Sequence, residues 1–281
     1  MTRFSLSPWE RAGVRVLAAA LILAIPTQAD AQQVTIQTPE IELQATYTPP
    51  KSPAKAPAIV ALHGCGGPFP ARDNQWRDLL AAQGHPILFP DSFGSRGLGS
   101  QCTTPNRTIG PNGKRRTDTV AAAKWLATQP TTPPGGPAGN IVVMGWSNGG
   151  STVLAAAAQG VMPPGIVRGF VAFYPGCKAT IDRPEWAPSA PLLIVMGEAD
   201  DWTSPEPCRQ LAARFPTQIK LVLYPGAYHD FDAPNRPVTT RTGLAFTANN
   251  NGIAHVGTNP EAREAAMRDV PAWIEQLPPA H

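Results

Sequence analysis

Short, mostly apolar runs alternate along this chain with segments whose apolar residues have helical spacing. The runs are rich in valine, isoleucine and leucine and are too short for buried helices. Continuous apolar runs of this kind are typical of strands that are buried on both faces of a parallel sheet. The predicted strands lie at residues 58–62, 86–89, 141–144, 169–174, 191–196 and 219–224.

The segments between these runs predict helices. In the first of them, Trp76 and Leu80 share one face of a helix over residues 73–83. Residues 32–57 alternate polar and apolar positions and then become proline-rich, which predicts one or two edge strands and a turn. The regular alternation of strand and helix favours a single α/β domain over residues 32–281, with a mostly parallel sheet and helices on both faces. Further predicted helices lie at residues 117–128, 151–159, 205–215 and 260–276.

The sequence GWSNGG at residues 145–150 stands at the junction of a predicted strand and a predicted helix. A serine in so tight a turn has strained φ and ψ angles, and Gly145 and Gly149 allow neighbouring backbone to come close. Gly-x-Ser-x-Gly in this setting is typical of a nucleophile elbow, which presents the Ser147 hydroxyl above the end of the strand. The amide of Asn148 opens the helix and is expected to face developing negative charge. The alternative is a glycine-rich turn with a surface serine.

Partners for this serine are expected at the carboxyl ends of the later strands, where open α/β sheets bind their ligands. Asp200 follows the strand at 191–196, and His229 follows the strand at 219–224. The resulting chain order Ser, Asp, His is the one that α/β-hydrolases use. In such a triad Ser147 attacks, His229 accepts its proton and passes it to the leaving group, and Asp200 orients the imidazole.

Other assignments compete with this triad. Glu198 and, more seriously, Asp201 are rivals of Asp200 for the acidic position, and His229 has the alternative of capping local backbone. A metal site at residues 229–232 is not favoured, because no second histidine lies at ligand spacing. The histidines that fit the catalytic role less well are His63, His85, His255 and His281.

The sequence HGCGG at residues 63–67 follows the first buried strand and is similar to the HGGG-type motif of lipases and esterases. Such a loop supplies a backbone N–H to the oxyanion of the tetrahedral intermediate. We expect the Cys65 amide to act with that of Asn148, with Gly66 as the second choice, and His63 to hydrogen-bond within the loop. The alternative is a tight turn with no catalytic part.

Residues 1–31 have the pattern of a secretory signal peptide. Three arginines precede the apolar run at 16–25, and the small residues at 29–31 resemble a cleavage site. The apolar run is short for a membrane span, and no later segment is long and apolar enough to be one. The sequence therefore predicts a periplasmic or secreted protein, with a retained membrane anchor as the alternative.

The charge of the chain points to no acidic partner. The leader carries three arginines and two acids, so its removal changes the net charge only from +3 to +2. The positive residues are scattered apart from the cluster at 114–116, so a nucleic-acid-binding surface is not indicated. That cluster is expected to be a solvated loop.

Four cysteines in an exported chain, without metal-type spacing, predict two disulfides. Cys65 and Cys102 fall in loops at the predicted active face, while Cys177 and Cys208 follow successive later strands. We therefore favour the pairs 65–102 and 177–208, the first of which would hold the oxyanion loop in place. Four reduced, buried thiols are the alternative if the chain is not exported.

Four motifs together resemble the dienelactone hydrolase family of the α/β-hydrolases, over nearly the whole chain after the leader. They are HGCGG at 63–67, GWSNGG at 145–150, GEAD at 197–200 and HDF at 229–231. The resemblance implies hydrolysis of ester or lactone bonds without a cofactor, and its Gly-Glu-x-Asp match supports Asp200. Dienelactone hydrolases proper have cysteine in the elbow where this chain has Ser147, so their particular lactone is not carried over.

Aromatic residues near the predicted strand ends are candidates to line an apolar substrate pocket. The segment at 230–259 is a long polar insertion that serves either as a wall of this pocket or as a surface loop. The aromatic candidates are Phe93, Trp146, Tyr174, Trp202, Tyr228 and Phe231.

The sequence as a whole favours a serine hydrolase that acts on a small-molecule or polymer-borne ester. A peptidase of the prolyl-oligopeptidase type shares the elbow and the triad order, but nothing here resembles its propeller domain. A binding protein without activity is the third interpretation. That interpretation predicts a broken triad.

Overall fold

The computed structural model describes residues 1–2, 31–55, 57–129 and 140–278. The predicted signal peptide and the terminal His281 therefore lie mostly or wholly outside the described residues. An eight-stranded sheet forms the centre of the fold, with strand order β1-β2-β4-β3-β5-β6-β7-β8. Its strands are β1 (Gln32–Gln37), β2 (Glu42–Thr48), β3 (Ala58–Leu62), β4 (Ile87–Pro90), β5 (Ile141–Trp146), β6 (Val167–Phe173), β7 (Leu192–Gly197) and β8 (Ile219–Tyr224).

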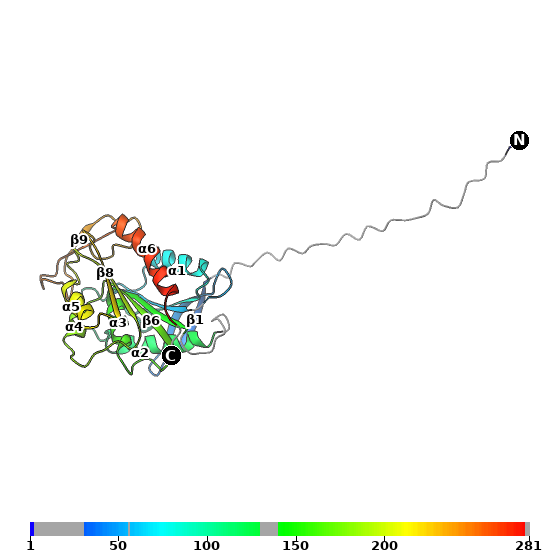
Figure 1. The fold of residues 1–281 in the computed structure, drawn as a ribbon. Coiled ribbons are helices and arrows are strands. Elements are labelled where there is room, and N and C mark those ends of the chain that lie inside the picture. The colour runs from blue at the N-terminus through cyan, green and yellow to red at the C-terminus, as the bar shows by residue number, and fades with distance from the viewer. Residues whose placement is uncertain (3–30, 56, 130–139, 279–281) are drawn as a thin grey trace.

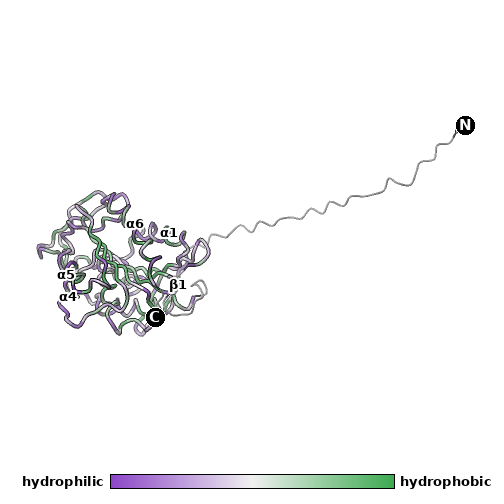
Figure 2. The backbone as a smooth tube through the Cα atoms, viewed as in Figure 1, coloured by the Kyte–Doolittle hydropathy of each residue, from purple (hydrophilic) through white to green (hydrophobic). Residues whose placement is uncertain are grey.

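The sheet is parallel from β4 to β8, and β1 and β2 extend it with antiparallel pairing. Strands β3, β5 and β7 are buried along their whole length, as their continuous apolar runs require. The edge strand β1 is mostly exposed, which agrees with its alternating sequence. Figure 2 shows the apolar residues concentrated in the central strands. The predicted, mostly parallel sheet is thus confirmed.

Helices cover both faces of this sheet. In Figure 1, α1 and α6 lie together on one side of it, with α2 and α3 on the other. This arrangement confirms the predicted α/β class. The helices are α1 (Pro70–Ala82), the 3₁₀ turn η1 (Gly94–Arg96), α2 (Lys114–Ala127), α3 (Asn148–Ala157), α4 (Lys178–Ile181), α5 (Glu206–Arg214) and α6 (Pro260–Glu275).

Two helix starts lie at the site described below. Helix α3 begins at Asn148, immediately after Ser147, as predicted for the residue that opens this helix. Helix α2 begins at Lys114 rather than at the predicted residue 117. The prediction that residues 114–116 form a solvated loop is therefore wrong, because they are the first turn of a helix and Arg115 is only 1% exposed.

The insertion at 230–259 folds against the rest of the domain instead of extending into solvent. It contains the antiparallel pair β9 (Thr239–Arg241) and β10 (Ala254–Val256). Just beyond β10, the amide of Gly257 donates to the carbonyl of His229 at 3.0 Å. The insertion therefore supports the backbone of a predicted site residue. Within the described ranges, no helix is long and apolar enough to cross a bilayer.

Candidate active site

Ser147 lies in the sharp turn between β5 and α3 with φ 53° and ψ −116°, outside the regions that L-residues ordinarily occupy. The turn is possible because its neighbours are glycines. A Cβ on Gly149 would collide with the carbonyl oxygen of Leu62, and one on Gly145 would lie 2.7 Å from the backbone of Gly149. The strain is thus held by tight packing of the elbow against the end of β3.

The structure brings Ser147, His229 and Asp200 together in a hydrogen-bonded chain. The Ser147 Oγ lies 2.9 Å from His229 Nε2, and His229 Nδ1 lies 2.8 Å from Asp200 Oδ2. The three residues come from the carboxyl ends of β5, β8 and β7, at one edge of the sheet. His229 and Asp200 are buried, and Ser147 is 8% exposed, so the hydroxyl is the end of the chain nearest to solvent.

Asp200 is held by the loop that follows it. Its Oδ1 accepts hydrogen bonds from the amides of Trp202 and Thr203, both at 2.9 Å, and the Thr203 hydroxyl lies 3.0 Å from Oδ2. These donors stabilise the charged carboxylate and fix its orientation. Sequence reasoning did not single out Thr203, since a threonine three residues after an aspartate carries no distinctive signal.

The two rival acids are engaged elsewhere. Asp201 Oδ2 lies 2.7 Å from His255 Nδ1, and its Oδ1 accepts the His255 amide at 2.8 Å. Glu198 pairs with Arg209 on the surface at 2.6 Å. Adjacent aspartates therefore serve different histidines, and Asp200 is the one that faces His229.

The pKa of His229 reflects two opposing effects. Burial disfavours the imidazolium and lowers the pKa, but the negative charge of Asp200 and its hydrogen bond raise it by more. The net result is a pKa above the ordinary histidine value. The pair is thereby suited to accept a proton from Ser147 and to stabilise the cation that results.

A buried carboxylate beneath the site was missed by the sequence interpretation. Asp232 accepts hydrogen bonds from the indoles of Trp76 and Trp146, both at 2.8 Å, and from the Tyr174 hydroxyl at 2.6 Å. The Tyr174 ring in turn packs 4.5 Å from the His229 ring, centre to centre. This network ties the strand of Ser147 to the segment of His229, and only the tertiary contacts identify it.

The two predicted oxyanion donors are placed at the start of α3 and in the loop after β3. Within the part of the chain that the structure describes, neither the Cys65 amide nor the Asn148 amide donates to a protein acceptor. His63 makes the expected hydrogen bond within its loop, with Nδ1 2.8 Å from the Gly64 oxygen. Burial, followed by the charge of Arg115, lowers the pKa of His63 well below its ordinary value, so the ring is neutral.

A cavity of about 200 Å³ opens beside Ser147 and His229. Trp202 lines this cavity, as predicted. Phe93, Trp146 and Phe231 do not, because each is at most 1% exposed and packs in the interior. Tyr174 packs against His229, and the ring of Tyr228 lies 5.0 Å from that of His255, centre to centre. The apolar pocket expected from these aromatics is therefore replaced by a cavity whose charged lining residues are Arg72, Asp230, Arg236 and Arg241.

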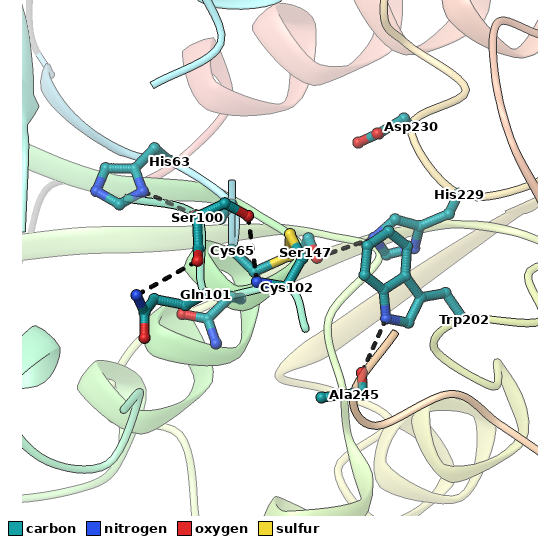
Figure 3. Close-up of a disulfide and its surroundings, with 12 residues drawn as sticks. His63, Cys65, Ser100, Gln101, Cys102, Ser147, Trp202, His229, Asp230 and Ala245 are labelled. Atoms are coloured by element: carbon teal, nitrogen blue, oxygen red, sulfur yellow. Dashed lines mark hydrogen bonds between the residues drawn. A yellow bond between two sulfur atoms is a disulfide. The ribbon is translucent and has the colours of Figure 1, made fainter. Parts of the chain in front are cut away.

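The cysteines pair in the favoured way, Cys65 with Cys102 and Cys177 with Cys208. The first disulfide lies beside Ser147 and joins the predicted oxyanion loop to the loop that carries Cys102, as Figure 3 shows. The amide of Gln101 also donates to the Cys65 carbonyl at 2.7 Å. The long loop after β4 is thus fastened to the predicted oxyanion loop. In the described ranges, no group of three or more acidic, histidine or cysteine side chains is arranged to hold a metal ion.

These features define an α/β-hydrolase fold, with Ser147 in the strand-to-helix turn at the carboxyl edge of its sheet. The chain belongs to the dienelactone hydrolase family, whose sequence profile matches residues 43–277. No curated protein gives a significant match.

Solved structures share this fold at low sequence identity. A dienelactone hydrolase candidate from Klebsiella pneumoniae aligns over 88% of this chain and 99% of its own, with 19% identity and a TM-score of 0.64. Dienelactone hydrolase from Anabaena variabilis gives 19% identity and a TM-score of 0.62, over 89% and 99% of the two chains. XC6422 from Xanthomonas campestris, an α/β serine hydrolase without a lid, has 17% identity and a TM-score of 0.56, over 89% of this chain and 97% of its own.

Proposed function

We propose that this protein hydrolyses carboxylic esters or lactones through an acyl-enzyme on Ser147. The observation that carries the proposal is the unbroken hydrogen-bonded chain from Ser147 through His229 to Asp200, which ends at a solvent-open cavity. A complete chain of this kind disfavours a purely binding role. Membership of the dienelactone hydrolase family supports the same reaction class.

In the acylation half-reaction, Ser147 Oγ attacks the carbonyl carbon of the substrate and its proton moves to His229 Nε2. The carbonyl electron pair moves to oxygen, and the resulting oxyanion accepts hydrogen bonds from the Cys65 and Asn148 amides. When the intermediate collapses, the bond to the alcohol oxygen breaks and His229 returns the proton to that leaving group. Asp200 keeps the imidazole in the productive tautomer throughout.

In the deacylation half-reaction, water replaces the alcohol. His229 takes a proton from the attacking water, a second oxyanion forms at the same two amides, and the acyl–Ser147 bond breaks. Ser147 recovers its proton from His229, and the carboxylic acid leaves. A lactone would follow the same steps, except that alcohol and acid remain in one product molecule.

The test is hydrolysis of a chain-length series of p-nitrophenyl esters by the oxidised protein without its leader. We expect Ser147→Ala and His229→Ala to lower kcat by at least about a thousandfold. Asp200→Asn should cost about a thousandfold or more, because it loses the correct imidazole tautomer. Asp201→Asn is the matched control and should stay within a few-fold of the unchanged protein.

Three results would contradict the proposal in different ways. An Asp201→Asn loss larger than that of Asp200→Asn would reassign the acid. Cleavage of peptide anilides in preference to esters would favour a peptidase of the same fold. Absence of both turnover and labelling by a fluorophosphonate would remove the case for a serine hydrolase and favour a binding role.

A further inference from the structure

We propose that Arg115 is the positioning residue of the oxyanion site, acting by joining the loop of Cys65 to the helix start at Asn148. The inference rests on the proposed function, because it assigns a role in the same reaction. The sequence predicts a solvated loop at residues 114–116, whereas the structure buries Arg115.

The guanidinium of Arg115 reaches both halves of the predicted oxyanion site. Its Nη1 donates to the side-chain oxygen of Asn148, and its Nη2 donates to the backbone carbonyl of His63 at 2.7 Å. Asn148 bears one predicted donor amide on its own backbone. His63 directly follows β3 and stands two residues before Cys65, whose amide is the other predicted donor. One planar fork therefore spans two segments that lie 85 residues apart in the sequence.

The two segments meet closely at their backbones, since an added Cβ on Gly149 would lie 2.6 Å from the carbonyl oxygen of His63. An added Cβ on Gly64 would lie 3.5 Å from the Trp146 carbonyl oxygen and 3.6 Å from the Ser147 Cβ. The loop of Cys65 is thus in contact with the elbow on the side of Ser147. Arg115 fills the other side of this junction from the first turn of α2.

Arg115 is itself held in one orientation. Its guanidinium carbon lies 4.9 Å from the centre of the Phe93 ring, which packs over it. The nearest acid on α2, Asp118, is occupied by a bidentate pair with Arg96 at 2.7 and 2.9 Å. The hydrogen bonds of Arg115 thus go to neutral acceptors of the site and not to a carboxylate.

A buried cation without a hydrogen-bonded counter-ion is costly to fold. Burial lowers the pKa of Arg115 to about 9, which still leaves it charged at neutral pH. The fork geometry explains why arginine occupies the position, since a lysine ammonium cannot hold two divergent acceptors at fixed spacing. Loss of the Arg115 guanidinium would displace the donor amides of Cys65 and Asn148. A displacement of about 1 Å in a catalytic group costs on the order of a hundredfold in rate.

The test compares Arg115→Met and Arg115→Lys with Arg116→Met, using p-nitrophenyl acetate and counting competent sites by fluorophosphonate titration. Arg116 is the matched control, one residue further along α2 and only half-buried. We expect Arg115→Met to lower kcat per titrated site by about ten- to a hundredfold. Acylation and deacylation both use the oxyanion site, so the substitution should slow the two steps alike and leave the ratio of their rates nearly unchanged. KM depends on that ratio and should therefore change less than about threefold. Arg115→Lys should recover part of the loss, and Arg116→Met should lose nothing.

A second variant separates positioning from folding. Asn148→Ala removes one arm of the fork, so combining it with Arg115→Met should cost clearly less than the product of the two single losses. If Arg115→Met lowers only the unfolding temperature, and each titrated site keeps its kcat, the positioning role is wrong while the ester-hydrolase proposal stands. If the unchanged protein shows no Ser147-dependent turnover, both proposals fail together.

Discussion

At the scale of single residues, neighbouring side chains of the same type have different roles because of what each one faces. Asp200 and Asp201 are adjacent, and each pairs with a histidine, at 2.8 and 2.7 Å. Only the first of these histidines, His229, lies within 2.9 Å of a serine hydroxyl. The strained φ of 53° at Ser147 is what lifts that hydroxyl to the imidazole.

The same residues predict the acid side of the pH profile. The base form of His229 is the neutral imidazole, and the charge of Asp200 raises the pKa of His229 above its ordinary value despite burial. Ester hydrolysis, measured as kcat/KM, should therefore rise with pH through this raised pKa. In Asp200→Asn, burial still lowers the pKa of His229, but the charge that raised it is gone. The rise of the residual kcat/KM with increasing pH should therefore begin at a lower pH than in the unchanged protein. An unchanged or upward-shifted acid limb in the variant would argue against this electrostatic pair.

At the scale of elements, the two disulfides fix different parts of the molecule. Cys65–Cys102 joins the predicted oxyanion loop to the long loop after β4, and the Cys102 carbonyl also accepts the amide of Ala245 from the insertion at 2.9 Å. Cys177–Cys208 joins the start of α4 to α5. The first disulfide is thus part of the cavity wall, while the second links two helices and does not line the cavity.

Removing each disulfide should separate stability from activity. The loops that they close span 37 and 31 residues, for which the entropic stabilisation is about 3 to 4 kcal/mol each. The paired changes Cys65→Ala with Cys102→Ala, and Cys177→Ala with Cys208→Ala, should therefore lower the unfolding temperature by similar amounts in calorimetry. Only the first pair should also lower kcat at a temperature where both variants are folded. Equal kcat losses in the two would show that the oxyanion loop holds its shape without its crosslink.

At the scale of the whole molecule, the first strand of the described residues comes directly after the predicted leader. Strand β1 starts at residue 32, and the family match covers residues 43–277. Two disulfides without a free cysteine among the described residues are typical of proteins that fold in an oxidising compartment. Export to the periplasm or the medium stays a prediction from the sequence of residues 1–31.

That prediction is tested by expressing the full chain in a bacterial host and measuring the intact mass of the exported protein. We expect cleavage after Ala31, so that the mature protein begins at Gln32 with both disulfides formed. Changing Leu21 and Leu23 to Asp interrupts the apolar run and should leave the protein inside the cell with its leader intact. Exported protein that keeps Met1 and stays with the membrane fraction would instead indicate a retained anchor.

The sequence by itself determined the strands of the central sheet, the class of fold and the elbow, because these follow from local patterns. A buried parallel strand must be apolar along its length, as β3 and β5 are, and a strand-to-helix turn as tight as that of Ser147 needs flanking glycines. The order Ser147, Asp200, His229 was readable for a related reason, since parallel strands place their carboxyl ends at one edge.

Only the tertiary structure decided which polar groups face one another across that edge. In the sequence, only the resemblance of the GEAD motif favours Asp200 over Asp201. Nothing local marks Asp232 as the shared acceptor of two indoles and a phenol, or shows that Arg115 is buried. In each case the deciding contact is with a residue dozens of positions away, and its geometry exists only after the strands have packed. Phe93, Trp146 and Phe231 were expected in the pocket and lie in the core for the same reason. A side chain near a strand end can point into the core or into the cavity, and packing alone sets which.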